Sequence, residues 1–430
     1  MSKESKIKRM KIDKDKLESI QAMLYSLEEE DISFSDDSGY LTEEEYVEIP
    51  DEIEIEEITL SFPDDQEYSI YSLEDFMEYM AEINSIKRVD NTTVRTNHII
   101  QTIISSSRMG YSGFEDKLFS YSFSDEDVDV SIVANPFLIG VMNSRENVYE
   151  QDFGYVACEP YKAIEIRVHG EADVDAHELV ERICYYLTDK LNVAVYPSEI
   201  ADINGLYDRV DEYYDFDEDD AGPAKKSELT EIGLKEVPRY SPILKMYRQA
   251  KGVEDPEIQF LQYYKIVEFV SPMVARKVAY ERLNKRLDLL PSVERDHKFL
   301  DSILLLSRKY DTDRRDDSLA MSVIECCVDV IPLFGMLPKR VRKILKGVLK
   351  FQKDSLTDED VTEEQIKGLQ KQIATMIYET RNSIVHAKSN YTPTGNEIQI
   401  DELPQANYVM DVVARSIINW NIRQPEGFRV

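Results

Sequence analysis

Apolar and polar residues follow different patterns in the two halves of the chain. After residue 240, apolar residues recur every three or four positions, as in Phe260, Tyr263, Tyr264, Val267 and Val270, which is the spacing of one face of an α-helix. This pattern predicts helices at 241–251, 256–289, 294–310, 316–330, 339–352, 362–388 and 403–421. Amphipathic helices bury their apolar faces by closing into a bundle, so we expect an all-α domain.

The helix predicted at 256–289 carries local signals for its start and for an interruption. Pro256 suits the first turn, because a proline lacks the amide group that would be unpaired there. Asp255 can cap the helix with its carboxylate. Pro272 lies inside the helical pattern and should kink or divide the helix.

The first half of the chain shows short alternating patterns instead. Alternation predicts half-buried strands at 117–123, 128–133 and 163–168. Residues 176–191 predict an amphipathic helix that leads into a strand at 193–196, and Ser72 is a loose N-cap signal for a helix over 72–85. The predicted fold class is therefore an α+β N-terminal domain followed by an all-α helical bundle.

Charge divides the chain in the same way. The 430 residues carry a net charge of −33, with a net of −35 in 1–230 and +2 in 231–430. Between Leu17 and Ile86 there are 23 acidic residues and no Lys or Arg, and 211–220 holds seven acids followed by Ala-Gly-Pro. We therefore predict an acidic α+β domain over 1–227, with a strongly acidic segment at 17–86 and an acidic linker at 207–227. The helical domain then covers 228–430.

The acidic segment 17–86 admits three interpretations. It can be a solvated and partly disordered surface, which is the usual behaviour of such a block. It can be an arm that docks on a basic surface and regulates it, because its self-repulsion would be relieved there. It can also present a row of carboxylates that imitates nucleic-acid phosphates. Calcium binding is not favoured, since no spaced D-x-D-x-D-G loop is present.

Common catalytic and metal-binding signatures are absent from the sequence. It contains no G-x-x-x-x-G-K-[ST], G-x-G-x-x-G, H-E-x-x-H or G-x-S-x-G motif. The segment HGEADVDAH, with His169, Asp173, Asp175 and His177, could bind a metal, but a polar loop between a strand and a helix is the simpler interpretation. We expect neither a metal nor a cofactor.

No segment of the sequence is typical of a membrane or secretory protein. The most apolar run, 318–337, contains two acids and a proline, so it falls short of a spanning helix. The basic N-terminal residues are not followed by the apolar stretch of a signal peptide. We therefore expect a cytoplasmic protein.

One short segment combines side chains suited to RNA cleavage. Residues 378–391 read YETRNSIVHAKSNY, in which Arg381, Asn382 and His386 form R-N-x-x-x-H at the end of a predicted helix. This segment resembles the HEPN family, whose ribonuclease members carry Arg-x4–6-His with a polar residue directly after the arginine. The resemblance extends loosely over 240–430, with 258–270 similar to an early helix of that bundle, and does not reach 1–230.

The spacing of these side chains sets what one helix can do. Arg381 falls on the apolar stripe of its helix with Ile377, so it must be paired or face an interface. It is either a ligand-binding arginine or one that forms a salt bridge with an acid of a neighbouring helix. Asn382 and His386 are four residues apart and can form a hydrogen bond that orients the imidazole. Arg381 and His386 lie about 140° apart around the helix, so one helix does not close a compact site.

The resemblance implies a ribonuclease whose site forms between two chains. A two-fold pairing brings the arginine and histidine of both chains together, and RNA is cleaved without a metal, leaving a 2′,3′-cyclic phosphate and a 5′-hydroxyl. His386 would act as base or acid and Arg381 would hold the phosphate, with Asn382 as the third catalytic residue. Large bacterial HEPN proteins of this plan resemble toxins and antiphage effectors. We therefore expect a homodimeric endoribonuclease whose N-terminal domain receives a trigger or regulator.

RNA binding also needs basic surface, which residues 331–353 offer with seven Lys or Arg and no acid. The residues that we predict to contact RNA are Lys339, Arg340, Arg342, Lys343 and Lys346, together with Lys388 beside the motif. The same residues also fit a solvated helix face, or a surface that pairs with the acidic segment 17–86. The alternative function is a non-enzymatic helical dimerisation or interaction module whose acidic half binds a basic partner.

Overall fold

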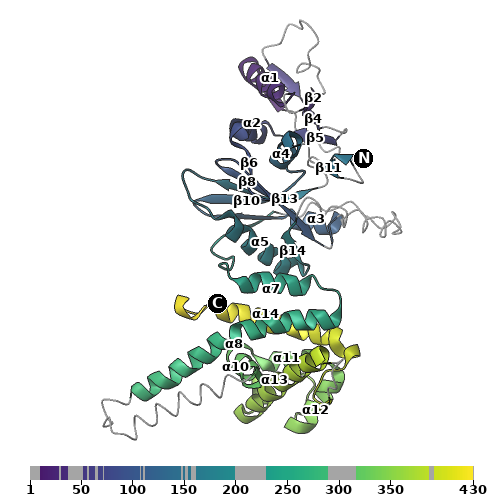
Figure 1. Ribbon diagram of the computed structural model, residues 1–430, viewed down its shortest axis with the longest axis vertical. Coiled ribbons are helices and arrows are strands. Elements are labelled where there is room, and N and C mark those ends of the chain that lie inside the picture. Colours follow the sequence, from purple (N-terminus) through teal and green to yellow (C-terminus); the bar gives the residue numbers. More distant parts are fainter. Residues whose placement is uncertain are drawn as a thin grey trace. The chain divides into compact units, whose positions relative to one another are not determined.

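The structure is a computed structural model that divides into two compact units, Met1–Val237 and Pro238–Val430 (Figure 1). It describes residues 10–28, 31–36, 52–55, 58–62, 66–70, 72–106, 108–109, 112–146, 149–150, 154–155, 161–198, 229–288, 316–386 and 392–429. The predicted boundary at 227/228 lies ten residues before the observed division. Strand β15 (Thr230–Gly233) explains the difference, because it pairs with β9 (Tyr121–Ser124) in the sheet of the first unit. The linker predicted at 207–227 lies wholly within 199–228, outside the described residues.

The first unit is α+β, as predicted, and is built on an eight-stranded, mainly antiparallel sheet. The strand order is β15-β9-β10-β13-β8-β7-β6, and β14 also pairs with β8. The predicted strands at 128–133 and 163–168 are confirmed, and the one at 193–196 is found two residues later. The remaining strands of the sheet are β6 (Lys87–Arg88), β7 (Thr93–Arg95), β8 (Ile99–Ser106), β10 (Val128–Ala134), β13 (Lys162–Val168) and β14 (Val195–Pro197).

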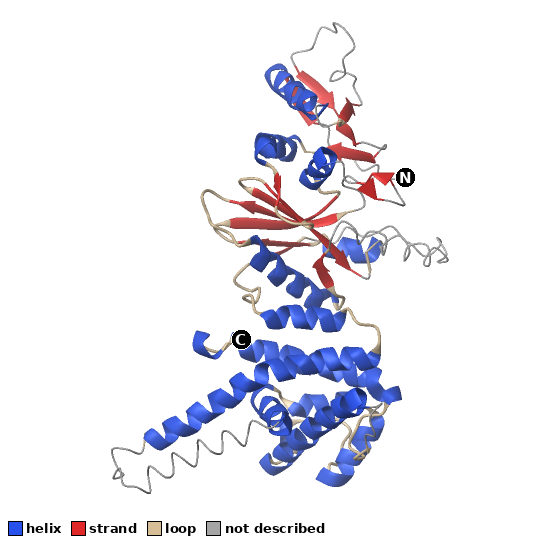
Figure 2. Ribbon diagram, viewed as in Figure 1, coloured by secondary structure: helices blue, strands red, loops and turns tan. Residues whose placement is uncertain are grey.

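Helices cover both faces of this sheet (Figure 2). Helices α2 (Leu73–Glu82) and α4 (Phe137–Glu146) lie on one face, and α5 (Ala176–Leu191) lies on the other. Alternate residues of a strand point to opposite faces. In β8, Ile99 and Ile103 accordingly join the core beside α2 and α4, whereas Ile100 and Ile104 join the core beside α5. The helix predicted at 72–85 is α2 continued by the 3-10 helix η2 (Ile83–Ser85), and Ser72 caps it.

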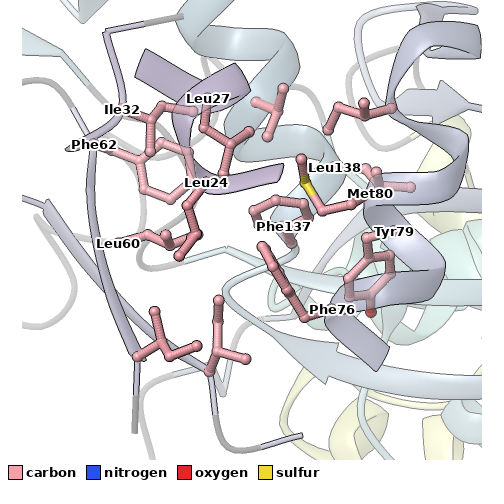
Figure 3. Close-up of a cluster of buried hydrophobic side chains, with 14 of the residues drawn as sticks. Leu24, Leu27, Ile32, Leu60, Phe62, Phe76, Tyr79, Met80, Phe137 and Leu138 are labelled. Atoms are coloured by element: carbon pink, nitrogen blue, oxygen red, sulfur yellow. The ribbon is translucent and has the colours of Figure 1, made fainter. Parts of the chain in front are cut away.

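The acidic segment 17–86 folds around apolar residues. Helix α1 (Lys14–Glu28) buries Leu17, Ile20, Leu24 and Leu27, which have helical spacing. Two small sheets, β1-β3 and β2-β4-β5, also bury apolar side chains. These side chains join the core that contains Phe137 (Figure 3). The described residues of this segment are therefore folded, while acids such as Glu18, Glu28 and Glu54 remain exposed to solvent. The strands are β1 (Met10–Asp13), β2 (Ser33–Asp36), β3 (Glu52–Ile55), β4 (Ile58–Phe62) and β5 (Gln66–Ile70), and β11 (Tyr149–Glu150) pairs with β12 (Gly154–Tyr155) later in the unit.

The strand predicted at 117–123 is wrong in its first half. Residues up to Leu118 belong to α3 (Ser112–Leu118), and the Phe119 N–H donates to the Glu115 carbonyl at 2.9 Å to close the helix. Strand β9 begins only at Tyr121. The alternation of Phe119, Tyr121 and Phe123 spans the turn between α3 and β9, because all three residues pack in the same core.

The second unit is a set of packed helices, as predicted. The helices are α7 (Pro242–Lys251), α8 (Pro256–Leu287), α10 (Asp316–Cys327), α11 (Val330–Met336), α12 (Lys339–Leu349), α13 (Glu363–His386) and α14 (Leu403–Ile422), with 3-10 turns η5 (Asp358–Asp360), η6 (Ile400–Glu402) and η7 (Glu426–Phe428). The helix predicted at 294–310 lies outside the described residues. Asp329 starts α11 as an N-cap that accepts from the Ile331 N–H at 3.1 Å, so the helix predicted at 316–330 ends early.

The start of α8 follows its sequence signals, and the helix continues past Pro272. Asp255 accepts hydrogen bonds from the amide groups of Glu257 and Ile258, both at 2.9 Å, which confirms the predicted cap. Pro272 does not divide the helix, which runs on to Leu287. Buried residues on both sides of Pro272, including Val270 and Val274, keep the helix packed through the proline.

No single helix among the described residues is long and apolar enough to cross a membrane. Ser318–Cys327 and Val330–Met336 meet those criteria only as a pair, and the pair is bent by 104° at its break.

A buried carboxylate joins three helices of the second unit. The Asp411 side chain in α14 is 5% exposed. Its Oδ1 accepts from the hydroxyls of Tyr247 and Tyr263 at 2.9 and 3.1 Å, and Lys251 and Arg415 form ion pairs with it at 3.0 and 2.9 Å. Burial and the Asp411 charge raise the pKa values of the Tyr247 and Tyr263 phenols above the ordinary value of a tyrosine. Both hydroxyls therefore keep their protons and donate them in hydrogen bonds. Asp411 therefore fixes how α7, α8 and α14 pack.

Replacing Asp411 with alanine should destabilise the second unit by about 3–5 kcal/mol, because buried donors and charges lose their acceptor. Trp420, the chain's single tryptophan, lies on α14 and is 7% exposed, so its fluorescence during urea titration reports unfolding of this unit. Asp401→Ala removes an exposed acid before α14 and should change stability by less than about 0.5 kcal/mol. Equal midpoints for the two variants would contradict the role of Asp411.

Candidate functional site

The motif residues lie where α13 leaves the core of the second unit. Upstream, Ile373 and Ile377 are 1% and 4% exposed and form the buried stripe of the helix. Arg381 and Asn382 follow as half-buried residues, and His386 is exposed at the last position of the helix. The last two turns of α13 are therefore accessible to a ligand while the preceding turns are fixed by packing.

Two residues of α8 hold the Arg381 guanidinium. Its Nη2 lies 3.2 Å from Glu268 Oε1, and its Cζ lies 5.6 Å from the centre of the Tyr264 ring. Tyr264 and Glu268 are four residues apart, so they stand on one face of α8. The sequence allowed two roles for Arg381, ligand binding or a salt bridge with an acid of a neighbouring helix, and this contact is such a salt bridge. The Arg381 and Glu268 side chains are 27% and 46% exposed, and such pairs are worth about 0–1 kcal/mol.

Asn382 orients Arg381 rather than His386. Its Oδ1 accepts from Arg381 Nη1 at 3.2 Å, and within the described residues this is the side-chain hydrogen bond that Asn382 makes. The predicted hydrogen bond between Asn382 and His386 is therefore wrong for the single chain.

Arg381 and His386 do not meet within one chain. The guanidinium turns toward α8, whereas His386 ends α13 with its side chain exposed. The family resemblance implies instead that a second copy of the chain brings its imidazole opposite the guanidinium. Lys388, predicted to bind RNA beside the motif, lies outside the described residues.

Several of the basic residues predicted to contact RNA already have partners. Arg340 forms an ion pair with Glu402 at 2.9 Å and donates to the Glu397 carbonyl at 2.9 Å. Lys346 pairs with Asp354 at 2.8 Å and thereby lowers the pKa of that carboxyl group. Arg342 donates to the main-chain carbonyl of the same aspartate at 3.5 Å. These contacts tie α12 to the segments around it.

Other basic residues of α12 stay available. Lys339 and Lys343 are exposed, and within the described residues neither forms an ion pair. Ile344 and Val348, 46% and 57% exposed, lie on the same helix. The part of α12 that can track an RNA backbone is therefore smaller than its charge alone predicts.

The described residues contain no group of three His, Cys, Asp or Glu side chains placed to hold a metal ion. In HGEADVDAH, Asp175 caps α5 by accepting from the Glu178 N–H at 3.0 Å, and His169 pairs with Asp129 at 2.9 Å. These two residues order the loop between β13 and α5.

Glu268 and Tyr264 are the site residues that the sequence analysis missed. The available signal was weak, because Glu268 is simply the acid between buried Val267 and Val270. Nothing in the sequence relates it to Arg381, which follows 113 residues later.

Comparison with known proteins gave no relative, since no family model, no curated protein and no solved structure matches the chain. Function is therefore inferred from the residues and their contacts.

Substitution of a basic residue on α12 that forms an ion pair should lower the free energy of unfolding more than substitution of one that forms none with a described residue. Arg340→Ala loses an ion pair and a charged hydrogen bond, so we expect about 1–2 kcal/mol of destabilisation by Trp420 fluorescence in urea. Lys343→Ala, on the same helix and without an ion pair to any described residue, should stay within about 0.5 kcal/mol of wild type. A larger loss for Lys343→Ala would show that the unpaired residue supports the fold.

Proposed function

We propose that the second unit is a HEPN-like, metal-independent endoribonuclease that works as a homodimer. The arrangement of Arg381 carries this proposal, because its guanidinium is prepositioned by Asn382 and Tyr264 and its one ion pair with a described residue is to the solvent-exposed carboxylate of Glu268. A phosphate can replace Glu268 at little cost, since an exposed ion pair is weak. Guanidinium and phosphate then form a bidentate, charge-assisted contact.

The reaction needs only the side chains of the motif. His386 of one copy takes the proton of the RNA 2′-hydroxyl as that oxygen bonds to phosphorus. The bond from phosphorus to the 5′-oxygen breaks, and the leaving oxygen takes up the proton that His386 accepted. Arg381 stabilises the charge that develops on the non-bridging oxygens. The products are a 2′,3′-cyclic phosphate and a 5′-hydroxyl, and neither water nor an oxidant is consumed.

The biological role that fits this activity is a regulated toxin or antiphage effector in the cytoplasm, with the first unit receiving the trigger. Free cleavage of cellular RNA would be lethal, so an enzyme of this kind needs a regulator. A separate α+β unit in the same chain can supply that control.

The alternative is a non-enzymatic helical interaction module whose acidic first half binds a basic partner. One observation favours it, namely that Arg381 already has a carboxylate partner in the single chain. In that function Arg381 would hold α13 against α8, and the exposure of His386 would carry no consequence.

Purified protein should cleave total RNA in EDTA, and His386→Ala and Arg381→Ala should each lose at least about 100-fold in rate, the usual contribution of a proton-transfer group. Product ends are identified by their resistance to phosphatase before, and sensitivity after, acid opening of the cyclic phosphate. Arg423→Ala removes an exposed arginine directly after α14 in the same unit and serves as the matched control. Equal cleavage by wild type and His386→Ala would contradict the proposal, and an intact RNA pool with full-length protein and with 238–430 alone would favour the interaction module.

The dimeric site can be tested by complementation. A mixture of Arg381→Ala and His386→Ala chains contains dimers with one intact arginine and one intact histidine on different copies. We expect the mixture, after unfolding and joint refolding, to recover a measurable fraction of wild-type cleavage while each variant alone stays inactive. No recovery in a mixture shown to contain mixed dimers would contradict a site shared between copies.

A further inference from the structure

A cavity of about 480 Å³ lies in the first unit, on the sheet face that carries α2 and α4. It is lined by residues of β5, α2, β10 and β13 and of the segment that leads into α4. Its volume falls within the range of about 300–1,000 Å³ typical of small-molecule sites. None of its lining belongs to the ribonuclease motif, so it is a separate feature of the molecule.

One wall of the cavity is aromatic. Tyr68, Phe76 and Tyr79 surround Phe137, with ring centres 5.6, 6.1 and 5.3 Å from it. Figure 3 shows Phe76, Tyr79 and Phe137 converging from α2 and α4. Packing within this group fixes the rings, so the wall is rigid and apolar.

A buried carboxylate forms the polar floor. Glu165 of β13 is 1% exposed and lines the cavity. Its Oε2 accepts from the Tyr79 hydroxyl and from Gln101 Nε2, both at 2.6 Å, and its Oε1 accepts from Arg167 Nε at 2.8 Å. Burial and the Glu165 charge raise the pKa of Tyr79, which keeps its proton. Gln101 in turn accepts from the Ile139 N–H at 3.2 Å, so the network also fixes the start of α4.

Negative charge exceeds positive charge at this end of the cavity. Arg167 also pairs with Asp75 at 2.9 Å and with Glu78, and its guanidinium lies 5.5 Å from the centre of the Tyr79 ring. One guanidinium therefore faces three carboxylates. An incoming cation is attracted to such a site, and an anion is repelled.

Two polar side chains of the lining are not used by the fold. Ser131 is paired in register with Glu165 across β10 and β13, and Asn135 has a φ of 49°, a left-handed conformation that non-glycine residues seldom adopt. Within the described residues, the side chain of neither one makes a hydrogen bond. They are available to orient a ligand beside the carboxylate floor.

We propose that this cavity of the first unit binds a small organic ammonium compound, with its apolar body against Tyr68, Phe76 and Phe137 and its cationic group beside Asp75 and Glu165. Ammonium groups bind well where carboxylates and aromatic faces occur together. Phosphorylated ligands and carboxylates are disfavoured by the excess of negative charge. Such a site makes the first unit a receptor for a small molecule, whatever the second unit does.

Calorimetric titration of the full-length protein tests the charge preference with three ligands of one shape. 2-Phenylethylamine is the cation, 2-phenylethanol is its neutral counterpart and phenylacetate is its anionic counterpart. We expect the amine to bind with a Kd below about 1 mM and the other two at least about 10-fold more weakly. Asp75→Asn, at a half-exposed position, should weaken amine binding about 10-fold while leaving the fold intact.

Two variants separate the cavity from general attraction to an acidic protein. Ser131→Leu keeps every charge but fills the cavity, so it should abolish amine binding. Asp173→Asn makes the same charge change as Asp75→Asn at an exposed position outside the cavity and should leave the Kd unchanged. The proposal would be overturned by equal binding of the three ligands or by no binding of the amine at 5 mM. It would also be overturned by wild-type binding of the amine to Ser131→Leu, or by equal weakening in the two Asp→Asn variants. Circular dichroism confirms that each variant is folded.

Discussion

A carboxylate that is shielded from water must find all of its partners inside the protein, and each unit of this chain is organised around one such group. In the first unit Glu165 takes hydrogen bonds from Tyr79, Gln101 and Arg167. In the second unit Asp411 draws on two tyrosines, a lysine and an arginine. Hydrophobic burial supplies most of the stabilisation but has no direction. These directional contacts select one arrangement of the surrounding helices and strands.

The ion pair at Arg381 differs from these two networks in its exposure. Asp411 is 5% exposed and cannot lose a partner cheaply, whereas Glu268 is 46% exposed and water can replace its partner. A guanidinium and a carboxylate therefore form a fixed structural contact at Asp411 and an exchangeable one at Glu268. An arginine that is held in position yet loosely paired is suited to receive a phosphate, which is why the proposed activity centres on α13.

The parts of the fold that depend on local patterns could be predicted from the sequence. The helix at 176–191 was predicted to the residue, because its amphipathic spacing is bounded by Asp175 as N-cap and by Asn192 in the left-handed conformation. The helix of the acidic segment was not predicted, because the high count of acids hides the helical spacing of Leu17, Ile20 and Leu24. Side-chain contacts that depend on the tertiary structure could not be predicted from the sequence. The selection of Glu268 by Arg381, and of Arg381 by Asn382, depends on which helices become neighbours and which rotamers then fit.

In the proposed enzyme, Arg381 exchanges Glu268 for an RNA phosphate. Competition between Glu268 and RNA for the guanidinium can be measured directly as a change in RNA affinity. The affinity for a fluorescent 2′-O-methyl RNA, which cannot be cleaved by 2′-hydroxyl attack, is compared by anisotropy for wild type, Arg381→Ala and Glu268→Gln. Removing the competing carboxylate in Glu268→Gln should tighten binding, and removing the guanidinium in Arg381→Ala should weaken it. Identical Kd values for the three proteins would contradict the claim and leave Arg381 as a structural residue that joins α13 to α8.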